Sequence, residues 1–171
     1  MSIRNIVQWP DPILSMAAQE VSKIGSEEIA VVSDMIETMR ANSGLGISAP
    51  QIGVSKKIAV IDLEKIHKNP ERKDLVMINP EIVDGMGDLV IEEGCLSIPG
   101  TYVPTQRAAL IVVKYTDENG QEKSRSAFDL ESIVIQHEID HLDGRLIVDS
   151  LPHDKRTKIL REIYEKKISR R

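Results

Sequence analysis

The chain has 171 residues, of which 41% are hydrophobic and 29% are charged, and its net charge is −5. These proportions are ordinary for a globular protein, and the length suits one hydrophobic core, so residues 1–171 are predicted to form a single domain. The negative charge argues against a protein that coats nucleic acid, and no DNA partner is expected. Cys95 is the only cysteine, which excludes an intrachain disulfide and favours a cytoplasmic location. No segment approaches the roughly 20 apolar residues of a membrane span, so no membrane partner is expected either.

The N-terminal part of the chain is predicted to be helical. Pro10–Pro12 precedes a short helix over residues 13–18, since proline favours the first turn of a helix. Ser26 begins a longer helix, because apolar residues recur after it at helical spacing until Asn42 and Gly44 interrupt the pattern.

The middle of the chain is predicted to form strands. Four short segments are rich in β-branched residues and are separated by proline, aspartate and glycine. They span residues 58–62, 75–78, 88–91 and 110–113. Asp117–Gly120 is predicted to form a hairpin turn in which Asn119 and Gly120 adopt positive φ angles.

The C-terminal part returns to helix. Asp129 is predicted to cap a helix over residues 130–143. After Pro152 a last helix, residues 152–171, carries apolar side chains on one face and charges on the other. The predicted fold class is α+β, with antiparallel strands packed around the central helix at 130–143, an N-terminal helix and a C-terminal helix.

The central helix contains the pattern H-E-x-x-H, formed by His137, Glu138 and His141. The two histidines are one turn apart, so both imidazoles project from one face and can bind the same metal ion. The apolar run Ile133–Ile135 lies one turn earlier, which indicates that this face is buried. Because buried ionisable groups are costly unless they are paired or ligated, the pattern predicts a metal site.

Three sources of a third metal ligand can be compared. The metalloprotease pattern H-E-x-x-H-x-x-G-x-x-H fails at its last position, which is Ile147. A glutamate from the last helix, Glu162 or Glu165, is a second source, although flanking basic residues explain both as surface ion pairs. Cys95, which follows a strand-like run, is the third source. Two histidines and one thiolate leave a fourth coordination position for water, as a catalytic site requires.

Residues 44–51, GLGISAPQ, form a glycine-rich segment between helix and strand. They satisfy a relaxed dinucleotide-binding pattern, G-x-G-x-x-A, but a helix precedes them where a strand is needed, and Pro50 interrupts any following helix. The alternative is a glycine-rich turn. Neither interpretation explains Gln51.

Taken together, GLGISAPQ, EGCLSIPG and QHEIDHLDG resemble the three signature motifs of peptide deformylases, in the same order. The segments PDPIL and DENG also resemble the family, so the resemblance covers essentially the whole chain. It implies a metal-dependent hydrolase that removes the formyl group from the N-terminal formylmethionine of newly synthesised polypeptides and releases formate. The single domain would then be catalytic, with residues 152–171 as its C-terminal helix.

The resemblance also implies roles for individual residues. The implied metal ligands are Cys95, His137 and His141. A metal-bound water would attack the formyl carbon, with Glu138 as the general acid/base. The side-chain amide of Gln51 and the backbone N–H of Leu96 would donate to the developing oxyanion.

The expected substrate site is an apolar pocket for the methionine side chain. Similarity to the family suggests that it is lined by Leu45, Ile91, Leu130, Ile133 and Val134, although each of these also suits an ordinary core position. Gly46 would let the substrate backbone approach and pair as an added strand. Arg107 resembles the family arginine that pairs with Asp140, and Glu93 is expected to orient the cysteine loop.

The expected cofactor is one divalent metal ion. Residue types do not separate zinc from iron or nickel, and the resemblance implies Fe²⁺ natively, with Zn²⁺ or Ni²⁺ acceptable in isolated protein. Since the family acts on nascent chains, the basic end of the last helix suggests a ribosome contact. Two other functions stay open, a zinc endopeptidase and a non-catalytic ribosome-associated adaptor. Ser48, Ser15 and Tyr102 depart from or vary within the family pattern, and Tyr102 is expected to influence longer substrates.

Overall fold

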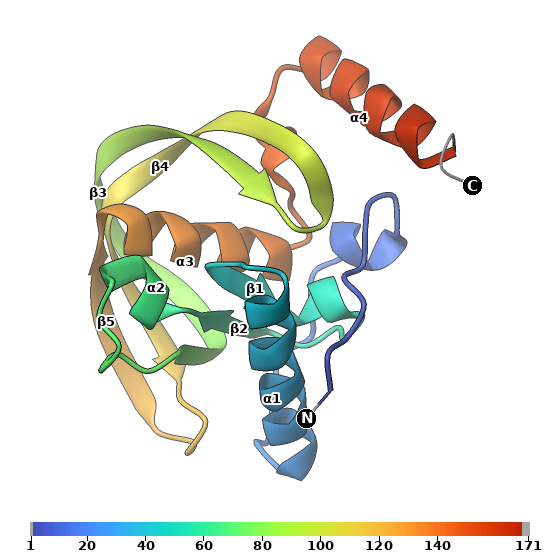
Figure 1. Cartoon of the computed structure of the whole chain (residues 1–171). Helices are drawn as coiled ribbons and strands as arrows, with labels where there is room; N and C mark the ends of the chain where they lie inside the picture. Colours follow the sequence, from blue (N-terminus) through green and yellow to red (C-terminus); the bar gives the residue numbers. More distant parts are fainter. Residues whose placement is uncertain (1, 169–171) are drawn as a thin grey trace.

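The computed structural model describes residues 2–168. Its strands are β1 (Gly46–Ser48), β2 (Ile58–Ile61), β3 (Leu75–Cys95), β4 (Ile98–Thr116) and β5 (Glu122–Phe128). They form one antiparallel sheet in the order β1-β2-β3-β4-β5, and helix α3 (Asp129–Leu142) lies within its curve (Figure 1). The predicted α+β class, with antiparallel strands around a central helix, is confirmed.

The other helical segments flank this sheet and helix. They are η1 (Pro12–Ser15), α1 (Ser26–Ala41), η2 (Ala49–Ile52), α2 (Leu63–His67), η3 (Ile147–Ser150) and α4 (His153–Ile168). In Figure 1, α4 stands apart from the sheet, and its end approaches the N-terminal segment. Among the described helices, none is long and apolar enough to cross a membrane.

The helical predictions differ from the structure at several places, three of which concern η1, α3 and α2. The helix predicted over residues 13–18 is a single 3-10 turn, because the backbone is extended again at Met16. Asp129 does not cap α3, since it is itself the first helical residue, with a φ of 49°, and no side chain caps this end. The short helix α2 is absent from the prediction, and it begins where the side chain of Asp62 accepts a hydrogen bond from the backbone N–H of Lys65.

Strands β3 and β4 are much longer than predicted. The segments 75–78 and 88–91 belong to one strand of 21 residues, and 110–113 lies within a strand of 19 residues. The β3–β4 ladder shifts register between residues 78 and 81 and again between 82 and 84. Such bulges break the alternation of side chains that makes a strand visible in a sequence.

The β4–β5 hairpin closes at the predicted turn, with one difference in its backbone. Gly120 has a φ of 80°, whereas Asn119 is not among the described residues with positive φ. The carboxylate of Asp117 accepts hydrogen bonds from the backbone N–H groups of Asn119 and Gln121, both at 2.9 Å. An aspartate-supported turn therefore needs only one glycine-type conformation here.

Helix α3 is held in place by an apolar core. Val134, Ile135, Ile139 and Leu142 pack with side chains of β2, β3 and β4 in one buried cluster. Burying a large aliphatic side chain contributes about 1.5–3 kcal/mol relative to leaving it exposed. Because this packing lies on the same helix as the H-E-x-x-H pattern, it also positions His137, Glu138 and His141.

The N-terminal segment crosses the loops that carry the motifs. The backbone N–H of Val7 donates to the carbonyl of Gln51 at 2.8 Å, and that of Trp9 donates to the carbonyl of Ser97 at 3.1 Å. A third backbone bond of 2.8 Å joins residue 18 to the last residue of α3. Residues 7–18 therefore tie together η2, the turn after β3 and the end of α3.

Candidate metal centre

Three side chains that are far apart in the sequence meet at one point. Cys95 is the last residue of β3, while His137 and His141 project from one face of α3. One ligand atom from each lies within 4.8 Å of the others, and the Cys95 Sγ to His141 Nε2 distance is 3.1 Å. No other such cluster of three is found among residues 2–168. The alternative ligands lie elsewhere, since Glu162 and Glu165 are on α4.

The chemistry of this cluster fits a divalent metal ion. A thiolate and two imidazoles form a set that leaves one position of a tetrahedral site free. Burial raises the pKa of the Cys95 thiol, but His141 and His137 outweigh it, so that the pKa lies well below its usual range. Nδ1 of His141 and Oε2 of Glu138 are buried without hydrogen-bond partners. Such a concentration of buried ionisable groups is costly unless a cation organises it.

A buried ion-pair network supports His137 from behind. Glu93 accepts a hydrogen bond from His137 Nδ1 at 2.8 Å and two from Arg107, at 2.7 and 2.9 Å. Burial raises the pKa of Glu93, but Arg107 and His137 lower it more, to about 2. The expected pairing of Arg107 with Asp140 is present, at 2.5 Å. Glu93 therefore orients the imidazole of His137, a contact that the sequence did not predict.

Replacing Arg107 with alanine is expected to destabilise the fold by about 3–5 kcal/mol, because it leaves the buried carboxylate of Glu93 without its counter-ion. Metal affinity is expected to fall roughly 10- to 100-fold as His137 loses its fixed support. Chemical denaturation and a chelator competition measure the two effects. Arg145→Ala is the matched control, since Arg145 pairs with the same Asp140 from a side chain that is 58% exposed. Equal losses in the free energy of unfolding for the two variants would show that the buried ion-pair network does not supply the expected stability.

The side chain of Gln51 is buried and held in one orientation. Its Oε1 accepts hydrogen bonds from the backbone N–H of Ser48 at 2.9 Å and from the Ser48 hydroxyl at 3.1 Å. Its Nε2 points toward Cys95 Sγ at 3.8 Å and Ser97 Oγ at 3.4 Å. The sequence does not reveal this role for Ser48, which is to direct the amide N–H groups of Gln51 toward the metal cluster.

Cys95 and His137 of the metal cluster, together with Glu138, line a cavity of about 610 Å³. All six predicted substrate residues line it, and they are Leu45, Gly46, Ile91, Leu130, Ile133 and Val134. Leu96 lines it as well. Gly46 is needed for a reason beyond substrate approach, because an added Cβ would lie 2.7 Å from Glu138 Oε1 and 2.8 Å from Val134 Cγ1. Its lack of a side chain thus allows α3 and Glu138 to pack closely against β1.

Tyr102 forms part of the rim of this cavity. Its side chain is 69% exposed, and its ring lies over Gly94 on the neighbouring strand. A Cβ at residue 94 would lie 3.0 Å from Tyr102 Cε1, so the glycine makes room for the ring. Tyr102 therefore lines the cavity with a largely exposed ring.

Comparison with known proteins supplies the identity of this site. The polypeptide deformylase family model matches residues 3–157. The chain belongs to the polypeptide deformylase family. It is therefore an enzyme that removes an N-formyl group, and the cluster of Cys95, His137 and His141 is the metal-binding site of such a deformylase.

Relatives in sequence and in structure agree with this assignment. A peptide deformylase of Endomicrobium trichonymphae is 42% identical over 167 residues, covering 98% of this chain and 97% of the relative. A crystal structure of a peptide deformylase from Legionella pneumophila has a TM-score of 0.89 and 37% identity, covering 99% of this chain and 98% of that one. The Ehrlichia chaffeensis peptide deformylase in complex with actinonin has a TM-score of 0.89 and 38% identity, covering 97% and 98%.

Several residues that line the deformylase cavity were not predicted as site residues, among them two of the N-terminal segment. Ile6 and Gln8 line it, although they belong to no motif. They alternate along the segment with Val7 and Trp9, whose backbone N–H groups bond to the motif loops. The sequence Ile6-Val7-Gln8-Trp9 does not alternate apolar and polar residues, so no periodicity marks the two lining residues.

Proposed function

We propose that this deformylase acts on the N-terminal formylmethionine of newly synthesised polypeptides and releases formate. The observation that carries the proposal is the meeting of Cys95, His137 and His141 beside the buried carboxylate of Glu138, in a cavity with apolar walls. We take residues 1–171 as one catalytic domain, because β3, α3 and the N-terminal segment all contribute to this cavity.

The three ligands would hold one divalent ion, Fe²⁺ in the cell and Zn²⁺ or Ni²⁺ in isolated protein. A thiolate with two imidazoles suits each of these ions. When bound, such an ion supplies Lewis acidity, which makes water nucleophilic near neutral pH and polarises the formyl oxygen.

Glu138 carries the proton in this proposal. Its side chain is 3% exposed, and its Oε2 has no hydrogen-bond partner. Burial raises the pKa of this carboxyl, although His137 and His141 oppose the shift. A carboxyl group of raised pKa is suited to accept a proton from the attacking water and to pass it to the leaving amine.

Gln51 and Leu96 stabilise the oxyanion that forms on the formyl oxygen. The Nε2 group of Gln51 is the donor, and its orientation by Ser48 supports this role. Leu96 contributes its backbone N–H from the segment that follows Cys95 and lines the cavity. One donor of this kind is typically worth about 3 kcal/mol of barrier.

The methionine side chain occupies the apolar part of the cavity. Leu45, Ile91, Leu130, Ile133 and Val134 surround this space. Strand β1 is at the edge of the sheet, with β2 on its one paired side. A substrate backbone can therefore pair in extended form with its free side.

Three peptides test the function with the wild-type enzyme. Formyl-Met-Ala-Ser is expected to release formate, whereas acetyl-Met-Ala-Ser is expected to remain intact, because its methyl group enlarges the group that must fit beside the metal. A long peptide with a free N-terminus is expected to show no internal cleavage by mass spectrometry. Internal cleavage without formate release would assign the chain to the endopeptidases and contradict the proposal.

A ribosome contact through α4 belongs to the same proposal. Part of the basic end predicted for this helix, residues 169–171, lies outside the described residues. Truncation after Ser150 would remove apolar side chains of α4 that pack against the core, so charge replacement is the cleaner test. In the test variant, glutamine replaces four basic residues, which are Lys166, Lys167, Arg170 and Arg171. Cosedimentation with ribosomes is expected to weaken, and unchanged cosedimentation would remove the contact from the proposal.

A further inference from the structure

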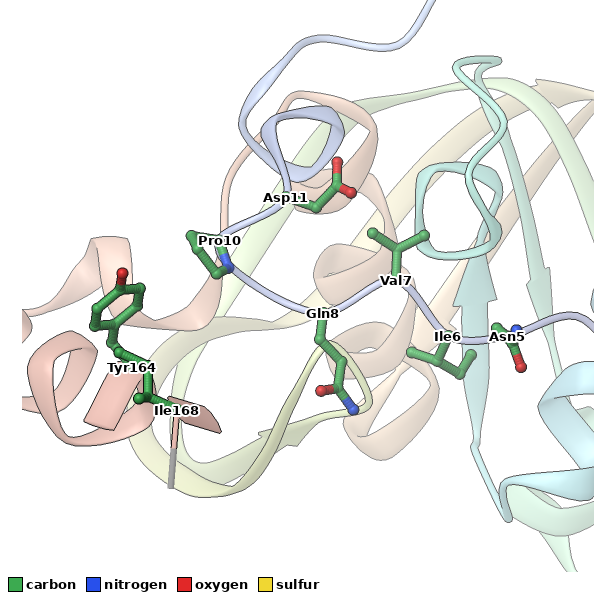
Figure 2. Close-up of a pocket in the computed structure, with 8 residues that line it drawn as sticks. All are labelled: Asn5, Ile6, Val7, Gln8, Pro10, Asp11, Tyr164 and Ile168. Atoms are coloured by element: carbon green, nitrogen blue, oxygen red, sulfur yellow. The ribbon is translucent and has the colours of Figure 1, made fainter. Parts of the chain in front are cut away.

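A second cavity of about 510 Å³ lies next to the metal cavity. Residues 5–8, Pro10 and Asp11 of the N-terminal segment form one wall, and Tyr164 and Ile168 of α4 form the other (Figure 2). None of the roles assigned to the metal centre uses this space.

The two cavities share a wall. Ile6 and Gln8 line both of them. Figure 2 shows these two side chains projecting to one side of the segment, while Val7 projects to the opposite side, as expected of an extended backbone. The wall is held firmly, since the backbone N–H of Val7 donates to the carbonyl of Gln51 at 2.8 Å. These two shared residues make the second cavity the neighbouring space for a chain that leaves the metal cavity along this wall.

The described lining residues of the second cavity offer groups that suit a polypeptide. Tyr164 and Ile168 are 49% and 55% exposed and offer apolar surface, while Gln8 offers an amide that can both donate and accept. Asp11 is the one charged side chain among the described lining residues, and it is acidic.

We propose that this cavity is a distal subsite for the substrate polypeptide itself. The residues downstream of the formylmethionine pass Ile6 and Gln8, and an apolar side chain among them rests against Tyr164 and Ile168. This inference rests on the proposed function and adds a preference for longer substrates that carry an apolar residue far from the cleaved group. Because the subsite does not touch the reacting atoms, it lowers KM and leaves kcat unchanged.

A length series tests the subsite. Formyl-Met peptides of three to ten residues are compared, with either serine or leucine in the positions beyond the third. For the wild type, KM is expected to fall roughly three- to tenfold once leucine reaches the subsite, at constant kcat. In Tyr164→Ala this gain disappears, while turnover of the tripeptide is unchanged. Met86→Ala is the matched control, because Met86 is 65% exposed and lines neither cavity.

A binding measurement keeps the inference separate from the proposed function. The Kd of fluorescent peptides with a free methionine N-terminus, measured by anisotropy, reports the same contact without turnover. A leucine-dependent gain in affinity that Tyr164→Ala abolishes supports the subsite even where no formate is released. Equal KM and Kd values across the series, or a gain retained in Tyr164→Ala, would overturn it. If Tyr164→Ala alters only ribosome cosedimentation or self-association, the cavity belongs to one of those partners and the inference fails.

Discussion

Replacing Cys95 with alanine is expected to remove the bound metal and, with it, formate release. Cys95 supplies the only sulfur ligand and lies 3.1 Å from His141 Nε2. Loss of an outer partner alone typically costs about 10- to 100-fold in metal affinity, so loss of a direct ligand should cost more than about 100-fold. Metal content per chain, measured by atomic emission after desalting, is the decisive quantity.

The control for this variant must separate metal loss from misfolding. Cys95 is 9% exposed and belongs to a buried cluster, so its replacement also removes packing. The circular dichroism spectrum of the Cys95→Ala variant is therefore recorded together with its metal content. Met86→Ala, at an exposed position on β3, should keep both metal and activity. A folded Cys95→Ala variant that retains one metal per chain and normal turnover would show that another residue is the third ligand.

Replacing Glu138 with glutamine is expected to give the opposite pattern, with metal retained and activity lost. Glutamine nearly preserves the shape of the side chain in its close packing against Gly46, but it cannot accept the proton of the attacking water. A positioned acid/base group typically contributes 10²- to 10⁴-fold, so kcat should fall by about that factor. Steady-state kinetics on formyl-Met-Ala-Ser, with metal content measured on the same samples, tests this. Loss of metal together with activity would instead assign Glu138 a structural role.

Features that depend only on residue spacing within one helix could be predicted from the sequence. The spacing of His137 and His141 places both on one helical face whatever the rest of the chain does. The apolar run Ile133–Ile135 correctly indicated burial, and Ile135 is 0% exposed. The choice of Cys95 over Glu162 as third ligand depends on contacts between distant segments, and residue patterns alone left it open.

The parts that the sequence did not reveal are those that tertiary packing decides. Most of β3 and β4 was not predicted, because bulges and polar outward-facing residues weaken the strand pattern in the sequence. These segments form strands because pairing with a long neighbouring strand overrides a weak local β-propensity. The role of Ser48 arises only once η2 folds Gln51 back onto it. Ile6 and Gln8 line the cavity because backbone hydrogen bonds hold residues 7–18 against the motif loops. Such backbone bonds do not depend on side-chain type, so the sequence does not indicate them.

The proton-transfer role of Glu138 at the metal site is tested most directly by formate release from formyl-Met-Ala-Ser, compared between the wild type and Glu138→Gln at equal metal content. If Glu138 carries the proton, the wild type turns over and kcat of the variant falls by about 10²- to 10⁴-fold, with one metal ion per chain in both. Indistinguishable rates for the two proteins at equal metal content would contradict it.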